Sequence, residues 1–338
     1  MPQTFAADTA VELAVVERSG FIESRHVGAA VVVDAEGQVL LELGDVRAPI
    51  LARSTLKPFQ AIASMQSGVP LRGPQVAIAG GSHHGTFDHL DVVEGMLAAA
   101  SLGETDLQCP PAWPYDEEVR AWLVRTERGK SRLAMECSGK HAAFLWACTE
   151  AGWDPGTYLD PEHPLQQRVV RVIEEYARET VAHVGVDGCG APVSAVSLAG
   201  LARAYSSLAQ APREIMADAR AATVATAMLD YPWAVAGPGA PDTVIMDELG
   251  VLAKSGAEGI LALGTASGVT VALKMLDGSG RAAPLVGLSL LQAAGVLDAD
   301  RVAAVLPRVS RPVLGGGEPV GRLGLAAPVA ALLERDPA

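Results

Sequence analysis

The chain contains no asparagine, and only five of its 26 basic residues are lysines. A GC-rich coding sequence suppresses both residue types together and accounts for the missing asparagine. Arginine can replace lysine at most solvated positions, but arginine cannot give up its proton and lysine can. The remaining lysines are therefore informative. They are Lys57, Lys130, Lys140, Lys254 and Lys274.

The chain also lacks an excess of positive charge. Its 26 basic residues are outnumbered by 39 acidic residues, which gives a formal net charge of −13. A nucleic-acid partner requires clustered lysine and arginine to neutralise phosphates. The composition therefore argues against a nucleic-acid partner.

No long apolar run is present. The longest charge-free stretches, such as residues 282–297, are shorter than the ~18 apolar residues that a membrane span needs, and they include Gly, Ser and Gln. The first 20 residues carry Asp8 and Glu12 and have no basic start, which is not typical of a secretory signal. We therefore expect a soluble cytoplasmic protein with no membrane partner.

The four cysteines are too few and too irregularly spaced for a disulfide framework. In a reducing compartment, thiol or metal roles are favoured over bridges. The four are Cys109, Cys137, Cys148 and Cys189.

What the sequence does have is material for a large core, with 49% hydrophobic residues. Strand-like runs lie near both ends, within about 12–45 and 250–276, and helical patterns fill the middle. The pattern predicts an α+β fold in which both chain ends form an antiparallel sheet and a helical lobe is inserted. We expect one domain, 1–338, with a sheet part at about 10–50 and 245–335 and a helical part at about 54–244. The helices expected are 55–67, 88–100, 117–126, 138–151, 164–182, 198–208, 212–229 and 282–294.

The first motif with possible chemistry is Ser-x-x-Lys, formed by Ser54 and Lys57 just before Pro58. Proline is tolerated only in the first turn of a helix, so a helix is expected to begin close to Ser54. Residues three apart share a helix face, which predicts the Lys57 amine beside the Ser54 hydroxyl. Such a pair is a nucleophile with a base. The simpler interpretation is a helix-capping serine with a solvated lysine.

The second motif is Gly80-Gly81-Ser82-His83-His84-Gly85, which follows the strand-like residues 75–79. Glycine-flanked polar residues after a buried strand are well placed to project into a cleft. The alternative is a polar loop that caps the next helix. The spacing of the two histidines does not favour a metal site.

The third motif is Lys254-Ser255-Gly256, at the end of an expected strand. Together with Ser-x-x-Lys, it reproduces two of the three motifs of serine β-lactamases and penicillin-binding proteins, in the same order. Ser82 occupies the place of the middle motif. The combination favours an active-site serine.

The fourth pattern brings together two thiols from separate turns. Cys137 and Lys140 lie at the start of an expected helix, and Cys189 lies in a glycine-rich turn with Asp187. Two thiols plus an oxygen or nitrogen ligand suit zinc. Spacing alone supports two reduced thiols equally well, because no Cys-x-x-Cys pair is present.

Taken together, RSTLKPFQ, GGSHHG, CSGKH, DPEHPLQ, VDGCGAPV and KSGAEG resemble the zinc-binding Ser–Lys L-asparaginases, the asparaginase II or rhizobial-type family. The resemblance covers residues 10–330 approximately. It implies a fold like that of serine β-lactamases, a homodimer, and hydrolysis of the small-molecule substrate L-asparagine to L-aspartate and ammonia.

The resemblance also implies roles for individual residues. The catalytic groups would be two Ser–Lys pairs, Ser54 with Lys57 and Ser82 with Lys254. One zinc ion per chain would be held by Cys137, Lys140 and Cys189, with Asp187 nearby. The substrate-binding residues would be Arg53, His83, Gly188, Ser255 and Glu258.

Two positions depart from the family pattern. Glu136 stands where an asparagine is usual, and Ala240 stands where an arginine is expected. Both positions bear on substrate preference. The alternatives are a Ser–Lys glutaminase, a β-lactam or peptide hydrolase on the same scaffold, or an inactive zinc-holding binding protein. Asparagine and glutamine differ by one methylene, worth only ~1–3 kcal/mol in a pocket.

Activation of serine by lysine requires a neutral amine. Free lysine has a pKa near ~10.4, whereas a useful base at neutral pH needs ~7–8. A second ammonium close by, together with partial burial, can supply such a decrease. We therefore expect Lys254 to help make Lys57 a base, and not only to hold the substrate.

Overall fold

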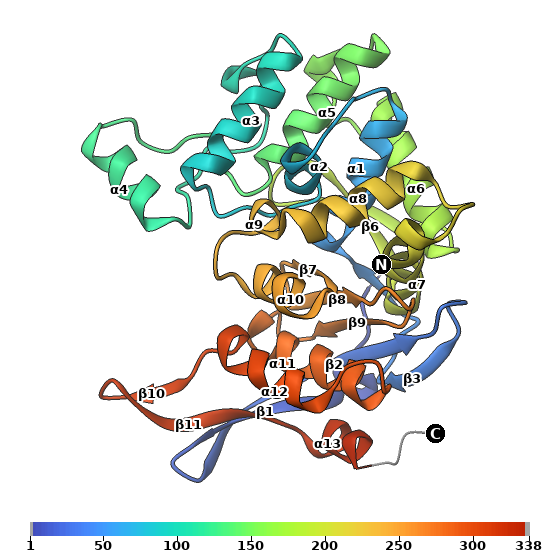
Figure 1. The fold of residues 1–338 in the computed structure, drawn as a ribbon, viewed down its shortest axis with the longest axis vertical. Helices are drawn as coiled ribbons and strands as arrows, with labels where there is room; N and C mark the ends of the chain where they lie inside the picture. Colours follow the sequence, from blue (N-terminus) through green and yellow to red (C-terminus); the bar gives the residue numbers. More distant parts are fainter. Residues whose placement is uncertain (1–2, 335–338) are drawn as a thin grey trace.

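The computed structural model describes residues 3–334, and its architecture is α+β (Figure 1). Within those residues, strands from both ends of the chain form one eight-stranded sheet in the order β10-β11-β1-β2-β9-β8-β7, with β3 paired to β2. The helical middle of the chain lies on one side of this sheet in Figure 1. The expectation of an α+β fold with a sheet built from both ends is confirmed.

The elements have the following bounds. The strands are β1 (Val11–Arg18), β2 (Phe21–Val33), β3 (Val39–Leu43), β4 (Pro49–Leu51), β5 (His183–Val186), β6 (Pro192–Ser197), β7 (Leu252–Gly256), β8 (Ile260–Gly264), β9 (Thr270–Met275), β10 (Val313–Gly315) and β11 (Glu318–Leu325). The α-helices are α1 (Lys57–Gln66), α2 (Pro74–Ala79), α3 (Phe87–Ala99), α4 (Glu117–Arg125), α5 (Ser138–Ala151), α6 (Pro164–Ala177), α7 (Leu198–Gln210), α8 (Ala219–Asp230), α9 (Pro232–Val235), α10 (Pro241–Leu249), α11 (Ala283–Ala293), α12 (Ala299–Val309) and α13 (Ala327–Leu333). Short 3-10 turns are η1 (Ala7–Thr9), η2 (Arg53–Leu56), η3 (Glu104–Asp106), η4 (Pro155–Thr157), η5 (Ala211–Arg213) and η6 (Gly280–Ala282).

Helices cover both faces of the central strands, which explains why β8 and β9 are buried along their whole length. Successive side chains of a strand point to opposite faces. A Cβ on Gly264 would touch Ala209 of α7, whereas a Cβ on Gly287 of α11 would touch Leu261 and Leu263. Neighbouring positions of β8 therefore face different helices. Strands buried on both faces have continuous apolar sequences.

A second, smaller sheet lies inside the helical part, where mainly helices were expected. It has three antiparallel strands in the order β4-β6-β5. The strand β4 ends two residues before Arg53, and the hairpin of β5 and β6 carries residues 187–191. This sheet therefore brings together two segments that are far apart in sequence.

Two local expectations were wrong. Residues 75–79 are helical, within α2, and not a strand. Pro74 is the first residue of this helix, where its fixed φ and missing N–H are tolerated. The helix expected at 212–229 begins only at Ala219, after Asp218 caps it by accepting a hydrogen bond from the backbone of Arg220.

The C-terminal region packs against the N-terminal strand β1. It contains α12, a β10–β11 hairpin and α13, and β11 pairs with β1 at the edge of the sheet. Among residues 3–334, no helix combines the length and the hydrophobicity that a membrane crossing requires.

Candidate active site

The small sheet places Arg53 and Ser54 beside the turn at residues 187–189. Arg53 has a φ of 51°, a left-handed conformation that is uncommon for a residue with a side chain. Its Nε donates a hydrogen bond of 2.6 Å to Asp187 Oδ1, and this ion pair is largely buried. The strained backbone and the ion pair together fix the start of η2, and Ser54 is its second residue.

Ser54 lines a cavity of about 310 Å³. Its side chain is nearly buried, with 9% of the residue exposed. The walls come from five parts of the chain, and the lining residues are Arg53, Ser54, Ala112, Trp113, Tyr115, Ala134, Met135, Glu136, Cys137, Asp187, Gly188, Cys189 and Ala257. This volume is at the small end of the range for ligand pockets, which suits a molecule the size of an amino acid.

Ser82 lies between two buried lysine amines. Lys57 Nζ is 2.8 Å from Ser82 Oγ and donates a 2.7 Å hydrogen bond to the carbonyl of Gly81. Lys254 Nζ is 3.0 Å from the same hydroxyl oxygen and donates to the carbonyl of Ser255. The expected pairing of Ser82 with Lys254 is therefore present.

Among residues 3–334, no side-chain hydrogen bond joins Ser54 and Lys57, so their pairing stays a prediction. The Lys57 amine instead reaches the loop at Gly81 and Ser82. Lysine has four rotatable side-chain bonds, so a shared helix face does not determine where its amine ends. Both lysines act on one hydroxyl, and the second serine, Ser54, lies in the cavity wall.

The loop that carries Ser82 is held tightly against the residues after α9. The backbone N–H of Ser82 donates to the carbonyl of Val235, and that of His84 donates to Ala236, each at 2.6 Å. A Cβ on Gly81 would come within 2.6 Å of the Val235 carbonyl. Glycine is thus required for this close approach, and the approach fixes the position of the Ser82 hydroxyl.

Lys254 is fully buried, and burial lowers its pKa to about 8. The carboxylate of Asp242, 3.8 Å from the amine, raises this pKa, and the ammonium of Lys57 lowers it. Desolvation prevails because the charged amine loses its water, while the nearest carboxylate, Asp242, is shared with Ser255. Asp242 also accepts two hydrogen bonds from Ser255, one from its N–H and one from its hydroxyl.

Asp242 was missed by the sequence analysis. It is 3% exposed and stands in the first turn of α10, directly after the Gly-Pro-rich residues 237–241. An acidic residue at a helix start after such a turn is a weak signal, because most such residues simply stabilise the helix N-terminus. The aromatic residues Trp113 and Tyr115 of the cavity were also missed.

The two thiols expected to bind metal are brought together. A hydrogen bond from Cys137 lowers the pKa of Cys189 far below its usual value, against the effect of burial, and the ammonium of Lys140 lowers it further. Lys140 Nζ is 3.0 Å from Cys189 Sγ, and Asp187 Oδ2 is 3.9 Å from the same sulfur. Burial lowers the pKa of Lys140, but Cys189 and Cys137 outweigh it and raise that pKa above its ordinary value.

These contacts give a donor set of two sulfurs and one nitrogen with a carboxylate at its edge. A thiolate is the form of cysteine that binds metals, and the hydrogen bond from Cys137 and the ammonium of Lys140 shift the pKa of Cys189 in the direction that favours this form. Among residues 3–334, no group of three or more His, Cys, Asp and Glu side chains is arranged to hold a metal ion. The expected set contains a lysine, and its two cysteines alone do not make such a group.

The residues expected to bind substrate do not all lie in the same cavity. Arg53 and Gly188 line the cavity of Ser54. His83 is corrected: it is fully buried, its Nε2 is 2.8 Å from the Ser138 hydroxyl, and it stacks on His89. Ser255 is occupied by Asp242 through both its N–H and its hydroxyl.

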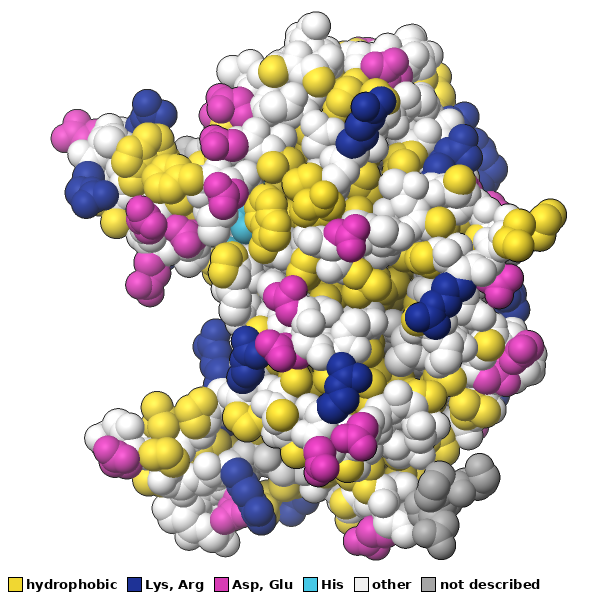
Figure 2. Space-filling view, in the orientation of Figure 1, with side chains coloured by type: hydrophobic (Ala, Val, Ile, Leu, Met, Phe, Trp, Pro, Cys, Tyr) yellow, Lys and Arg dark blue, Asp and Glu magenta, His cyan; other side chains and the backbone are white. Residues whose placement is uncertain are grey.

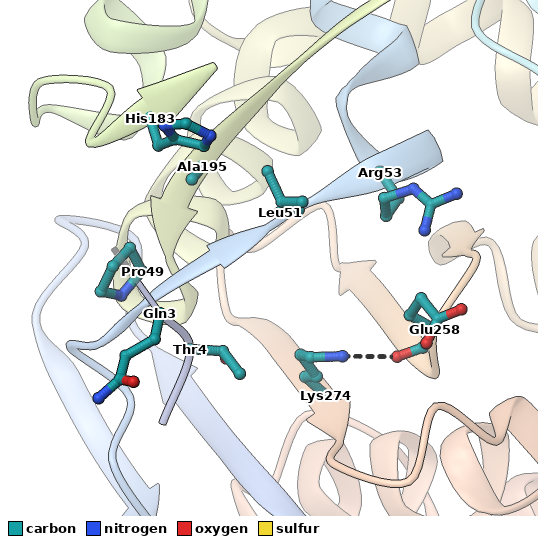
Figure 3. Close-up of a pocket in the computed structure, with 9 residues that line it drawn as sticks. All are labelled: Gln3, Thr4, Pro49, Leu51, Arg53, His183, Ala195, Glu258 and Lys274. Atoms are coloured by element: carbon teal, nitrogen blue, oxygen red, sulfur yellow. Dashed lines mark hydrogen bonds between the residues drawn. The ribbon is translucent and has the colours of Figure 1, made fainter. Parts of the chain in front are cut away.

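Glu258 lines a different cavity, which shares Arg53 with the cavity of Ser54. This second cavity, of about 350 Å³, lies on the other side of Arg53 and is lined by Gln3, Thr4, Pro49, Leu51, Arg53, His183, Ala195, Glu258 and Lys274 (Figure 3). Lys274 Nζ donates a 2.8 Å hydrogen bond to the backbone carbonyl of Glu258. Neither Ser54 nor Ser82 is among its lining residues.

Glu136 contributes a carboxylate to the cavity of Ser54. Its charge and a hydrogen bond raise the pKa of Tyr115, together with partial burial. The ring of Tyr115 also packs against His84, with the ring centroids 5.6 Å apart. One wall of the cavity thus carries a negative charge, while Arg53 supplies a positive charge in the same space.

Comparison with known proteins was made by sequence and by structure. The sequence model of the L-asparaginase II family matches residues 14–325. No curated protein sequence matches the chain. The crystal structure of Mglu in its native form shares 15% identity at a TM-score of 0.42, over 81% of this chain and 66% of that chain. This chain therefore spans slightly less than two thirds of the length of Mglu.

Two other solved structures are similar at the same level. A β-lactamase from Mycobacterium bovis shares 16% identity at a TM-score of 0.39, over 82% of this chain and 93% of that chain. A Bacillus glutaminase shares 15% identity at a TM-score of 0.39, over 80% of this chain and 91% of that chain.

Proposed function

Because this chain belongs to the L-asparaginase II family, a family of amidohydrolases, we propose that it hydrolyses the side-chain amide of L-asparagine to L-aspartate and ammonia. One observation carries the proposal. The Ser82 hydroxyl lies within 3.0 Å of two buried lysine amines, and Ser54, three residues before one of those lysines, lines a small cavity. Such an array has the parts of a serine hydrolase with a lysine base.

Ser54 is the nucleophile in this mechanism, because it is the serine in the cavity wall. Its oxygen forms a bond to the amide carbon, and the bond from that carbon to nitrogen breaks as ammonia leaves. The product of this step is an ester of Ser54. Water then attacks the ester carbon and releases aspartate.

Ser82 and the two lysines move the protons. The Ser54 proton passes to a neutral amine of this array, and Ser82 delivers a proton to the departing nitrogen. Lys254 is suited to be the neutral member, since burial lowers its pKa to about 8. The short contacts of Lys57 and Lys254 with one oxygen let the proton taken up by one amine be returned through Ser82.

Two backbone N–H groups are suited to stabilise the oxyanion. Ser54 stands near the start of η2, where N–H groups have no partner within the helix. Ala257 follows β7 and lines the same cavity. A Cβ on Gly256 would lie 3.4 Å from the Ser54 nitrogen, so the end of β7 is close to this backbone. Removal of one such donor typically costs about 2.7–4 kcal/mol of transition-state stabilisation.

Charges on opposite sides of the cavity support an amino-acid substrate. The guanidinium of Arg53 is suited to the α-carboxylate, and the carboxylate of Glu136 is suited to the α-ammonium group. The cavity of about 310 Å³ limits the substrate to a small amide. Asparagine is preferred in this proposal to the larger glutamine.

We propose further that Cys137, Lys140 and Cys189 hold one zinc ion, with Asp187 nearby. The thiolate character of Cys189 supports this donor set, and Lys140 would release its proton on binding. Bound zinc would supply a positive charge that assists substrate binding at the cavity wall.

The test is ammonia release from L-asparagine and L-glutamine by the purified protein, with a chromogenic β-lactam as a third substrate. We expect asparagine to be hydrolysed with the highest kcat/KM. Ser54→Ala should abolish turnover, whereas a rapid acid quench of the wild type followed by peptide mapping should find the acyl group on Ser54. An acyl group on Ser82 would reverse the assigned roles. Faster hydrolysis of glutamine or of the β-lactam would overturn the substrate assignment.

A further inference from the structure

A large cleft lies next to the candidate active site, and the proposed reaction makes no use of it. Its volume is about 910 Å³. It lies between the residues before α10, the start of α11 and the end of α12. We call it the arginine cleft. Its lining residues are His84, Pro238, Gly239, Ala240, Pro241, Gly280, Arg281, Pro284, Pro307, Arg308, Val309, Ser310, Arg311 and Pro312.

The charge of this cleft is opposite to that of the whole protein. Three arginines line it, and no aspartate or glutamate is among its lining residues, although the chain has a net charge of −13. Figure 2 shows basic side chains gathered where the surface is hollowed between α4 and the β10–β11 hairpin. A concave surface lined by one sign of charge concentrates ions of the opposite sign.

Two of the three guanidinium groups are available to a ligand. Arg308 forms an ion pair with Glu248 at the rim. The side chains of Arg281 and Arg311 make no hydrogen bond or ion pair within residues 3–334. Guanidinium groups bind phosphate and carboxylate oxygens in pairs of parallel hydrogen bonds. The guanidinium groups of Arg281 and Arg311 in one cleft therefore match a ligand with at least two anionic groups.

The cleft has stiff walls. Five of its lining residues are prolines, Pro238, Pro241, Pro284, Pro307 and Pro312, and proline fixes the backbone φ. A pre-formed site loses less conformational entropy when a ligand binds than a flexible one. The small side chain of Ala240, where the family resemblance predicts an arginine, leaves room beside His84.

The cleft shares a wall with the reaction site. Gly237 is packed so closely against His84 that a Cβ there would come within 2.8 Å of the imidazole. His84 is two residues from Ser82, and its other side packs on Tyr115 of the cavity. A ligand that contacts His84 would therefore contact the same loop that carries Ser82.

We propose that the arginine cleft binds a small polyanion, a molecule with two or more phosphate or carboxylate groups. Arg281 and Arg311 hold the anionic groups, and the ring of His84 lines the same cleft. The ligand is separate from the amide substrate, and the proposal does not depend on the proposed reaction.

The test is isothermal titration calorimetry with two probes, pyrophosphate and citrate, in a low-salt buffer free of other polyvalent anions. We expect at least one probe to bind the wild type and to bind the double variant Arg281→Ala/Arg311→Ala about tenfold more weakly or worse. The matched control is Arg125→Ala/Arg171→Ala, which removes the same charge from exposed positions elsewhere and should bind like the wild type. Circular dichroism shows whether each variant is folded.

The two probes distinguish the chemistry of the ligand. Preference for pyrophosphate identifies a phosphate ligand, and preference for citrate identifies a carboxylate ligand. Saturable protection in a thermal-shift assay, lost in the cleft variant only, is an independent readout. Absence of binding up to about 5 mM of both probes, or equal weakening in the two double variants, would overturn the proposal.

Discussion

At the scale of single residues, the decisive feature is the hydroxyl of Ser82 between two amines. A serine oxygen can accept two hydrogen bonds and donate one, so it can link Lys57 and Lys254 in a proton path. The sequence motifs identify all three residues. They do not show which serine each lysine amine contacts, because a lysine side chain can extend to a neighbouring loop as easily as along its own helix.

The lowered pKa of Lys254 predicts a pH dependence of activity. The amine is protonated below about pH 8 and neutral above it, because burial and Lys57 outweigh the opposing effect of Asp242. Cys137 and Glu136 are further negative neighbours that raise this pKa. If the neutral amine is required, kcat/KM for asparagine rises as the pH increases through about 8. A pH–rate profile measures this, and a flat profile between about pH 6 and 9 would contradict it.

Asp242→Asn is the matched variant for this pH dependence. The substitution removes a carboxylate that raises the pKa of Lys254. The rise in kcat/KM should therefore move to lower pH. A rise that stays in place would mean that another group controls the profile.

Zinc binding is tested by the metal content of the purified protein. We expect about one zinc per chain in the wild type and almost none in Cys189→Ser, because the variant loses the thiolate ligand. The control is Cys148→Ser, which changes a buried cysteine of α5 outside the proposed donor set. Equal zinc content in the two variants would exclude Cys189 as a ligand.

At the scale of secondary-structure elements, the pairing of β2 with β9 joins the two ends of the chain. Gly28 is opposite Met275 in this ladder. A Cβ on Gly28 would lie 2.1 Å from the carbonyl oxygen of Lys274, which is backbone and cannot move without disturbing the strand. The absence of a side chain is therefore a condition for this register.

Gly28→Ala is expected to destabilise the fold by about 3 kcal/mol or more, because overpacking against backbone must shift the strand. The control is Gly95→Ala in α3, where a Cβ meets nothing within 4 Å. That change should stabilise the protein by roughly 0.5–1 kcal/mol, since alanine is the better helix former. Urea unfolding curves measure both, and equal midpoints would contradict the steric argument.

Element prediction from the sequence succeeded where the pattern was strong and failed where short segments depended on distant partners. The long helices α5 and α6 and the strands β7 to β9 were recognised from apolar spacing and bounding glycines. The strands β4 and β5 have three and four residues, and only their pairing with β6 makes them strands. The missed small sheet is also the element that positions Arg53 and Asp187.

At the scale of the whole molecule, the sheet and the helical part share one core. A single cluster of buried hydrophobic side chains includes Val31 and Leu273 of the sheet and Phe59 and Phe144 of the helical part. The order of the strands and helices expected from the sequence predicts that both parts belong to one domain. A continuous core predicts that they unfold together.

Tryptophan fluorescence offers a clean test of that cooperativity. All five tryptophans lie between residues 113 and 233, in the helical part, so their fluorescence does not report on the sheet. Far-ultraviolet circular dichroism reports on both parts. We expect the two signals to change at the same urea concentration, and an earlier fluorescence transition would mean two independently folding units.

The ladder between β2 and β9 also has a consequence for biosynthesis. Val33 of β2 pairs with Thr270 of β9. The ribosome must therefore make most of the intervening chain before β2 can pair with β9. At roughly 5–20 residues per second, that delay is roughly 10–50 s. During this delay, the apolar residues Ala29–Val33 are not yet paired with β9. The nascent chain therefore exposes an apolar strand until β9 has been made.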